Sequence, residues 1–192
     1  MTYIRNTLTT SLTTPMQTQL SFLAKLALFS ALGAGAFLTQ QSLAQSAEQW
    51  DLSAVDKYNN RDFQGAIADW TKSIELNPTD AFVFLQRGRA KSKTWDGHGA
   101  VNDFNAAIRI NPQYVSAYYQ RADTKYYILG DTHGALSDYT KVIELRPDVT
   151  AAYRERGLVR EGMGNRNGAC LDWRKAAALG DIEASRWARE QC

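Results

Sequence analysis

One short motif, an alanine followed three residues later by an aspartate and then by an aromatic residue, occurs four times in this chain. The copies begin at Ala66, Ala100, Ala135 and Ala169, at intervals of 34, 35 and 34 residues. A unit of this length is too small to bury its own apolar face, so it is stable only when it stacks against neighbouring copies. The spacing therefore predicts a repeat protein whose stack presents a long surface to another molecule.

Each unit is expected to contain two helices. In the first half of a unit an aromatic residue precedes a small residue by four positions, and the second half repeats that separation with its alanine and aromatic residue, so each pair shares one helical face. The first-half pairs are Trp50 and Ala54, Phe84 and Gly88, Tyr118 and Ala122, and Tyr153 and Gly157. The small residues should let the paired helices approach closely, with the aromatic residues in the core.

The ends of the helices can also be located. Pro78, Pro112 and Pro147 follow the second helices of the first three units, where a residue without an N–H cannot continue a helix. The extra residue of the third unit falls between Ala122 and Ala135, in a stretch rich in turn formers. A loop is therefore expected to absorb the insertion while the helices keep their register.

The residues that recur at equivalent positions of the four units, called columns below, resemble those of the tetratricopeptide repeat. The fullest match is given by Gly88, Ala100, Phe104, Ala107 and Pro112. The resemblance covers roughly residues 47–181. It implies an all-α fold, a right-handed superhelical solenoid of four helix-turn-helix repeats with a C-terminal capping helix. The expected segments are repeats at 47–80, 81–114, 115–149 and 150–181, followed by a capping helix at 182–192.

Acidic and basic residues form two further columns. Aspartate occurs in every second helix, and arginine occurs in the first helices of the last three units but not of the first, which has no aspartate-bearing helix before it. This pattern predicts a ladder of ion pairs across unit boundaries. The expected pairs are Asp69 with Arg87, Asp103 with Arg121 and Asp138 with Arg156, with Arg186 as a partner for Asp172.

The first 44 residues read as a signal peptide. They contain two basic residues and no acidic residue, residues 26–38 are an apolar run, and Ser42 and Ala44 are small residues at the positions that a signal peptidase reads. We expect cleavage after Ala44. Translation that starts at Met16 rather than at Met1 would give a more ordinary signal peptide. The run is shorter than the roughly 20 residues that span a bilayer, so no stable membrane span is expected afterwards. An organelle transit peptide is the alternative.

Removal of this segment changes the charge balance. The whole chain has 22 Lys and Arg against 20 Asp and Glu, and the segment takes away Arg5 and Lys25, which leaves 20 against 20. A net charge of zero gives no support for nucleic acid or an anionic membrane as a partner. Export places the protein in the bacterial periplasm or an equivalent extracytoplasmic compartment.

Both cysteines, Cys170 and Cys192, lie in the last 23 residues. The last unit lacks the closing proline and runs into a short amphipathic segment that would cover an otherwise exposed apolar face. An exported chain permits oxidation, and similar endings occur in exported bacterial proteins that the chain resembles. A disulfide between Cys170 and Cys192 would attach this cap to the stack.

In the family that the chain resembles, the concave surface is lined chiefly by first helices. Carrying these columns over nominates a groove rich in tyrosine. Its residues are Asp51, Val55, Tyr58, Phe82, Leu85, Arg89, Lys93, Tyr119, Asp123, Tyr126, Tyr127, Arg154, Leu158 and Glu161. Tyr126 and Tyr127 precede the insertion, so which of them faces the groove stays open, as does the packing of the other beneath the longer turn.

The sequence predicts no enzyme, cofactor or metal site. No phosphate-binding loop, HExxH or GxSxG pattern is present, and His98 and His133 fall in equivalent turns too far apart to share a metal. The groove lacks the lysines and asparagines with which some relatives grip a carboxyl terminus. We expect an extracytoplasmic adaptor or assembly scaffold that binds a protein or peptide segment. A glycan-binding module of the cell envelope, stacking sugars on the tyrosines, is the alternative.

Overall fold

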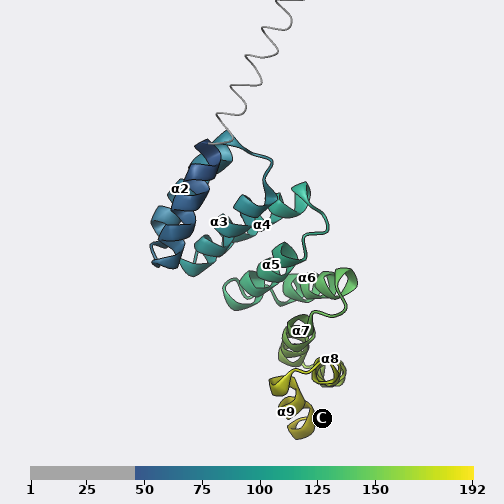
Figure 1. Cartoon of the computed structure of the whole chain (residues 1–192). Coiled ribbons are helices and arrows are strands. Elements are labelled where there is room, and N and C mark those ends of the chain that lie inside the picture. The colour runs from purple at the N-terminus through teal and green to yellow at the C-terminus, as the bar shows by residue number, and fades with distance from the viewer. Residues whose placement is uncertain (1–45) are drawn as a thin grey trace, which may run out of the picture. The chain divides into compact units, whose positions relative to one another are not determined.

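A computed structural model describes residues 46–192, and every regular element in that part of the chain is an α-helix (Figure 1). The elements are a helix at 46–59, then α2 (Phe63–Leu76), α3 (Ala81–Lys93), α4 (Gly97–Ile110), α5 (Val115–Tyr127), α6 (Thr132–Leu145), α7 (Thr150–Gly162), α8 (Arg166–Ala178) and α9 (Ile182–Glu190). The predicted all-α architecture of stacked helix pairs is confirmed.

The helices pack in chain order. Within units α3 packs on α4, α5 on α6 and α7 on α8, while α2 meets α3, α4 meets α5 and α6 meets α7 across unit boundaries. Contact between α3 and α5 brings first helices of neighbouring units together. The first helices of the second and third units therefore lie together on one face of the stack.

Alanine and aromatic residues make the core as the repeat columns predict. The alanines of the motif and the aromatic residues that follow them are almost completely buried; they are Ala66, Trp70, Ala100, Phe104, Ala135, Tyr139, Ala169 and Trp173. A Cβ placed on Gly88 would lie 2.6 Å from Cε1 of Phe104, and one on Gly157 would collide with Trp173. The small first-helix residues are thus required by the rings packed against them.

The turns between the two helices of each unit share the same local structure. A polar residue caps the second helix by accepting a hydrogen bond from the glycine N–H three residues later; the caps are Asp62, Asp96, Asp131 and Asn165. The residue before each cap has a positive φ, at Arg61, Trp95, Gly130 and Gly164. The third turn contains one residue more than the second, which confirms that the insertion lies in this loop.

The arginine–aspartate ladder exists, but its predicted pairing across unit boundaries is wrong. Asp103 pairs with Arg87 at 2.7 Å and Lys91 at 2.8 Å, both on the first helix of its own unit. The same arrangement joins Asp138 to Arg121 and Lys125, and Asp172 to Arg156 and Arg160 rather than to Arg186. Asp69 takes Lys57 and the Ser53 hydroxyl, both at 2.6 Å.

The arrangement of the helices explains why the ion pairs form within units and not across unit boundaries. The two helices of a unit face each other along their length, so each arginine meets the aspartate of the helix that follows it. Its remaining N–H groups reach back across the boundary, where Arg87 donates to Thr71 at 3.1 Å and Arg156 to Thr140 at 3.2 Å. Each arginine therefore joins two units, although only one of its partners is a carboxylate.

Of the aromatic residues of the first helices, Tyr153 is buried as predicted, Phe84 and Tyr118 are only partly buried, and Trp50 is exposed. Arginines three positions later lie over the rings of Phe84, Tyr118 and Tyr153 at 5.3 to 5.8 Å from the ring centres. Trp50, whose helix has Ser53 in that column, is 37% exposed and takes Lys72 instead at 6.0 Å. These rings therefore stabilise the basic side chains that lie over them through cation–π contacts.

Replacing Asp103 with alanine should lower the free energy of unfolding by about 3 kcal/mol, because Arg87 and Lys91 would remain desolvated without a carboxylate. Urea denaturation of the purified variant measures this loss. Asp148→Ala is the control, since Asp148 and Arg146 form an ion pair in which both side chains are more than half exposed, and it should change stability little. Equal stability of the two variants would refute the structural role of the ladder.

The C-terminal cap forms as predicted. α9 buries Ala184 and packs Trp187 against Trp173, with ring centres 5.5 Å apart. Cys170 and Cys192 are joined in a disulfide with their Cα atoms 5.6 Å apart. Asp181 caps α9 through the Ala184 N–H and also accepts from Arg154 at 2.8 Å. The last unit is therefore covered by a helix held at both of its ends.

Replacing both cysteines with serine should lower the free energy of unfolding by about 3 kcal/mol, because the bond closes a loop of some twenty residues in the unfolded chain. Urea denaturation with and without dithiothreitol measures the effect. The reductant should destabilise the native protein and leave the double variant unchanged. A native protein insensitive to reduction would show that α9 stays docked without the bond.

The predicted signal peptide, its cleavage after Ala44 and the start at Met16 lie outside the described residues. Within residues 46–192, none of the helices combines the length and apolar character that crossing a bilayer requires.

Candidate functional site

A pocket of about 320 Å³ lies on the face formed by the first helices, between α3 and α5. We call it the groove pocket. Its lining residues are Tyr58, Arg89, Ser92, Lys93, Gln120, Asp123, Thr124, Tyr127 and Ile128. The hydroxyls of Ser92 and Thr124 lie 2.8 Å apart and join the two helices. The pocket is thus held by packed helices rather than by a loose loop.

Two cations mark one end of the groove pocket. The guanidinium of Arg89 lies over the ring of Tyr58, 5.6 Å from its centre, and donates to Gln86 at 2.9 Å. Lys93 stands one helical turn further along α3 and is exposed. Neither forms an ion pair with a carboxylate of residues 46–192. This end therefore offers positive charge that the described chain does not neutralise.

Asp123 lines the other end of the groove pocket, and Glu155 adjoins that end without lining it. Asp123 accepts a hydrogen bond from the Tyr139 hydroxyl, and Glu155, which is 8% exposed, accepts from Tyr127 at 2.7 Å. Arg154 donates to Glu155 at 3.0 and 3.1 Å and partly compensates it. Burial raises the pKa of Asp123 to about 6, and the nearby charge of Glu155 acts in the same direction. The groove pocket is therefore positive toward the first two units and acidic toward the last two.

Two hollows adjoin the groove pocket and share Tyr58 with it. One, of about 510 Å³, is lined by Tyr58, Asn59, Arg61, Phe63 and Lys93. The other, of about 160 Å³, is lined by Val55, Tyr58, Asn59, Trp70, Gln86 and Arg89. Tyr58 is consequently the side chain around which the hollowed surface of the first two units is built.

Five residues nominated from the sequence come together in the groove pocket: Tyr58, Arg89, Lys93, Asp123 and Tyr127. The ambiguity between neighbouring tyrosines is settled. Tyr127 lines the pocket and is 55% exposed, whereas Tyr126 packs against the core formed by α5, α6 and α7. Tyr126 therefore faces the core and α7, and Tyr127 faces the pocket.

Other nominated residues do not belong to the pocket. Leu85 is 5% exposed and packs among the alanines of α4 and α5, so its assignment to the groove is wrong. Tyr119 packs edge-on against Tyr139, with ring centres 5.7 Å apart, and Arg154 is engaged by Glu155 and Asp181. Phe82 is 49% exposed but lies outside the groove pocket. The resemblance thus nominated five residues that do line one pocket, together with others that turn inward or lie outside it.

The sequence interpretation missed several residues that shape the pocket. Ser92, Thr124 and Ile128 line it without belonging to an aromatic or charged column. Gln120 lines the pocket as well and is not among the nominated groove residues. Glu155 is not among them either, because its carboxylate contacts the pocket only through the hydroxyl of Tyr127, 28 residues away.

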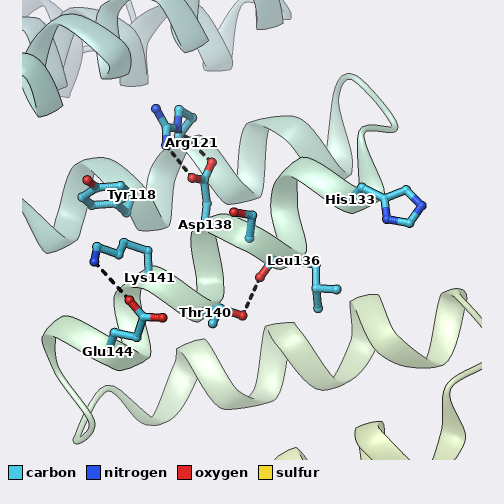
Figure 2. Close-up of a pocket in the computed structure, with 9 residues that line it drawn as sticks. Tyr118, Arg121, His133, Leu136, Asp138, Thr140, Lys141 and Glu144 are labelled. Atoms are coloured by element: carbon cyan, nitrogen blue, oxygen red, sulfur yellow. Dashed lines mark hydrogen bonds and ion pairs between the residues drawn. The ribbon is translucent and has the colours of Figure 1, made fainter.

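A second pocket, of about 530 Å³, lies over α6 and is shown in Figure 2. Its charged groups already have partners, since Arg121 binds Asp138 and Lys141 binds Glu144 at 3.0 Å. The Thr140 hydroxyl donates to the Leu136 carbonyl at 2.8 Å. It therefore presents a satisfied polar surface, and it is a useful location for control substitutions.

Residues 46–192 contain no group of three or more His, Cys, Asp or Glu side chains arranged to hold a metal ion. His98 and His133 are both exposed.

Comparison with known proteins identifies the fold. Residues 115–149 match the family model described as tetratricopeptide repeat. A crystal structure of MamA protein is 20% identical, covers 75% of this chain and 79% of its own, and superposes with a TM-score of 0.70. The first tetratricopeptide domain of Spaghetti (RPAP3), bound to an HSP90 peptide, is 23% identical, covers 63% of this chain and 95% of its own, with a TM-score of 0.61.

An Arabidopsis OM64 tetratricopeptide domain is 21% identical, covers 62% of this chain and 98% of its own, with a TM-score of 0.60. A search among curated proteins found no match. The chain thus contains a tetratricopeptide repeat and has the fold of tetratricopeptide repeat proteins. Scaffolds of this kind generally serve protein–protein interaction and are typically non-catalytic, consistent with the extended surface that a stack of repeats creates.

Substituting Asp123 with asparagine should flatten the dependence of stability on pH. The folded-state pKa of Asp123, about 6, lies above the 3.8 of an unperturbed aspartate, so the folded protein binds the proton more tightly and its stability falls as pH rises from 4 to 6. Comparing urea denaturation at pH 4 and pH 7.5, the native protein should lose about 1 to 3 kcal/mol more than the variant. Parallel profiles would contradict this assignment.

Proposed function

We propose that this protein is a non-catalytic adaptor or assembly scaffold that binds a peptide or protein segment in the groove pocket. The observation that carries the proposal is a pocket between α3 and α5 with a cationic end, an acidic end and tyrosines at both. Tyrosine offers a large contact area and a polar hydroxyl at low entropic cost, and the rigid helices bind without reorganising. An extended segment can satisfy both charged ends at once.

A similar structure supports a peptide as the kind of ligand. The Spaghetti (RPAP3) domain is bound to the HSP90 peptide SRMEEVD. At 23% identity this likeness concerns the fold, and it shows that a stack of these repeats accommodates a short peptide. The groove of the present chain has carboxylates at one end, Asp123 and Glu155, so its preferred segment need not share the charge distribution of that peptide.

We place the adaptor outside the cytoplasm. Support comes from the apolar amino-terminal run that precedes Ala44 and from the disulfide between Cys170 and Cys192, because disulfides persist in oxidising compartments. The bacterial periplasm, or an equivalent compartment, is the setting that fits both features.

The geometry favours a peptide over a glycan. A sugar-binding surface needs flat aromatic faces side by side, whereas Tyr126 and Tyr127 meet edge to face, with ring centres 4.9 Å apart and planes at 74°. Tyr58 has one face against Arg89. The tyrosines are therefore arranged around a charged pocket and do not form a stacking platform.

A capture experiment tests the proposal. The protein, expressed from the full-length gene and purified after export, serves as bait on a cross-linked envelope extract beside a Gln120→Ala, Tyr127→Ala variant. Proteins enriched by the native protein should fall about tenfold with the variant, as for loss of a central aromatic contact.

The matched control is His133→Ala, Ser137→Ala, which alters two exposed side chains of the α6 pocket (Figure 2). It should capture as much as the native protein. Equal recovery by all three proteins would place the binding surface elsewhere, and enrichment of glycan without protein would favour the alternative function.

A further inference from the structure

The cations around Tyr58 differ from the other basic residues of the first helices. The ladder places Lys57, Lys91, Lys125 and Arg160, together with three arginines, against buried aspartates. Arg61, Arg89 and Lys93 instead line the hollows that meet at Tyr58 and form no ion pair with carboxylates of residues 46–192. Three uncompensated positive charges therefore converge on one hollowed surface.

An exposed tryptophan follows one of these cations, Lys93, in the chain. Trp95, two residues after Lys93, is 74% exposed and has a φ of 64°, a left-handed conformation that is costly for a bulky side chain. The equivalent turns of the third and fourth units have Gly130 and Gly164 in this conformation, where glycine adopts it freely. A strained backbone that presents a large aromatic side chain to solvent indicates a contact with another molecule.

The charge of the surface narrows the chemistry of that molecule. An apolar helix would leave three cations desolvated without partners, which is unfavourable. Carboxylate side chains match the guanidinium and ammonium groups, and tyrosine and tryptophan add contact area for the segment that carries them. The acidic end formed by Asp123 and Glu155 repels carboxylates, so it accepts instead the hydrogen-bond donors of the segment.

We infer that the occupant of the groove is an acidic peptide segment whose side-chain carboxylates bind Arg61, Arg89 and Lys93 while the segment contacts Tyr58 and Trp95. This inference rests on the proposed function, which requires a peptide but no particular charge. Recognition is of side chains, so a free carboxyl terminus is not needed. The acidic part of the segment lies over the first two units, and basic or uncharged residues lie toward Asp123.

Selection from a random library provides the test. A display library of 12-residue peptides, each followed by a neutral linker, is selected on the protein purified after export. Enriched peptides should be rich in Asp and Glu. They are then synthesised with acetylated and amidated ends, and their binding is measured by fluorescence anisotropy beside versions with Gln and Asn in place of the acids. The acidic versions should bind at least about tenfold more tightly, with an affinity that falls as salt rises.

Two variants locate the site. Arg89→Gln, Lys93→Gln should weaken the acidic peptides about tenfold, and the control Arg109→Gln, Lys175→Gln, with the same change of charge at exposed positions outside the described hollows, should not. Trp95→Gly should weaken binding about fivefold while its unfolding temperature stays at or above that of the native protein, because glycine removes the backbone strain. Loss of binding with retained stability separates contact from folding.

The outcomes distinguish this inference from the proposed function. Enriched peptides that are not acidic would overturn the inference and leave peptide binding intact. A selection that enriches no peptide would overturn both. Unchanged affinity in Arg89→Gln, Lys93→Gln would overturn the assignment of the cations, and unchanged affinity in Trp95→Gly would overturn that of the tryptophan. Binding to phosphatidylglycerol vesicles in place of peptides would show that the patch faces a membrane.

Discussion

The structure depends on the close approach of two helices within each unit, where a residue with little or no side chain lies against a large ring. Gly88 meets Phe104 and Gly157 meets Trp173 at distances that leave no room for a Cβ. This contact buries the alanines of the motif completely and fixes how the two helices lie along each other. Every other regular feature, including the ion pairs, the capped turns and the groove, follows from that fixed geometry.

The helix pairing also decides which charges are used for stability. Because the first helix of a unit faces the second along its length, Arg87 and Lys91 reach the same buried carboxylate, Asp103. The basic residues that face the second helix are therefore engaged in ion pairs within the protein. On the concave side Arg154 is paired with Glu155 and Asp181, whereas Arg89 and Lys93 form no ion pair within residues 46–192 and remain available. The two faces of one first helix thus have different roles: one carries the basic residues of the ladder, and the other carries the basic residues of the groove.

The sequence predicted the helix pairs, the buried columns, the loop that holds the insertion and the capping helix, because each depends on spacing along one chain. It failed where a contact depends on the angle between helices. Asp103 was assigned to the arginine of the next unit, and Leu85 was assigned to the groove although it turns into the core. Periodicity shows which residues share a helix face. It does not show which residues at the edge of that face turn into the core, as Leu85 does. Glu155 and Tyr139 entered the site only through hydroxyl contacts that no spacing reveals.

The strain at Trp95 connects the fold to recognition. The turns inside the four units all have a positive φ, and two of them use glycine, so the turn itself does not require a side chain there. Arg61 and Trp95 occupy this position in the first two units; Arg61 lines one of the hollows, and Trp95 follows the lining residue Lys93 by two positions in the chain. The last two units, where glycine stands, instead carry the carboxylates of the groove. Strained backbone and unpaired positive charge therefore coincide on one half of the stack, which argues that a partner, rather than folding, maintains both.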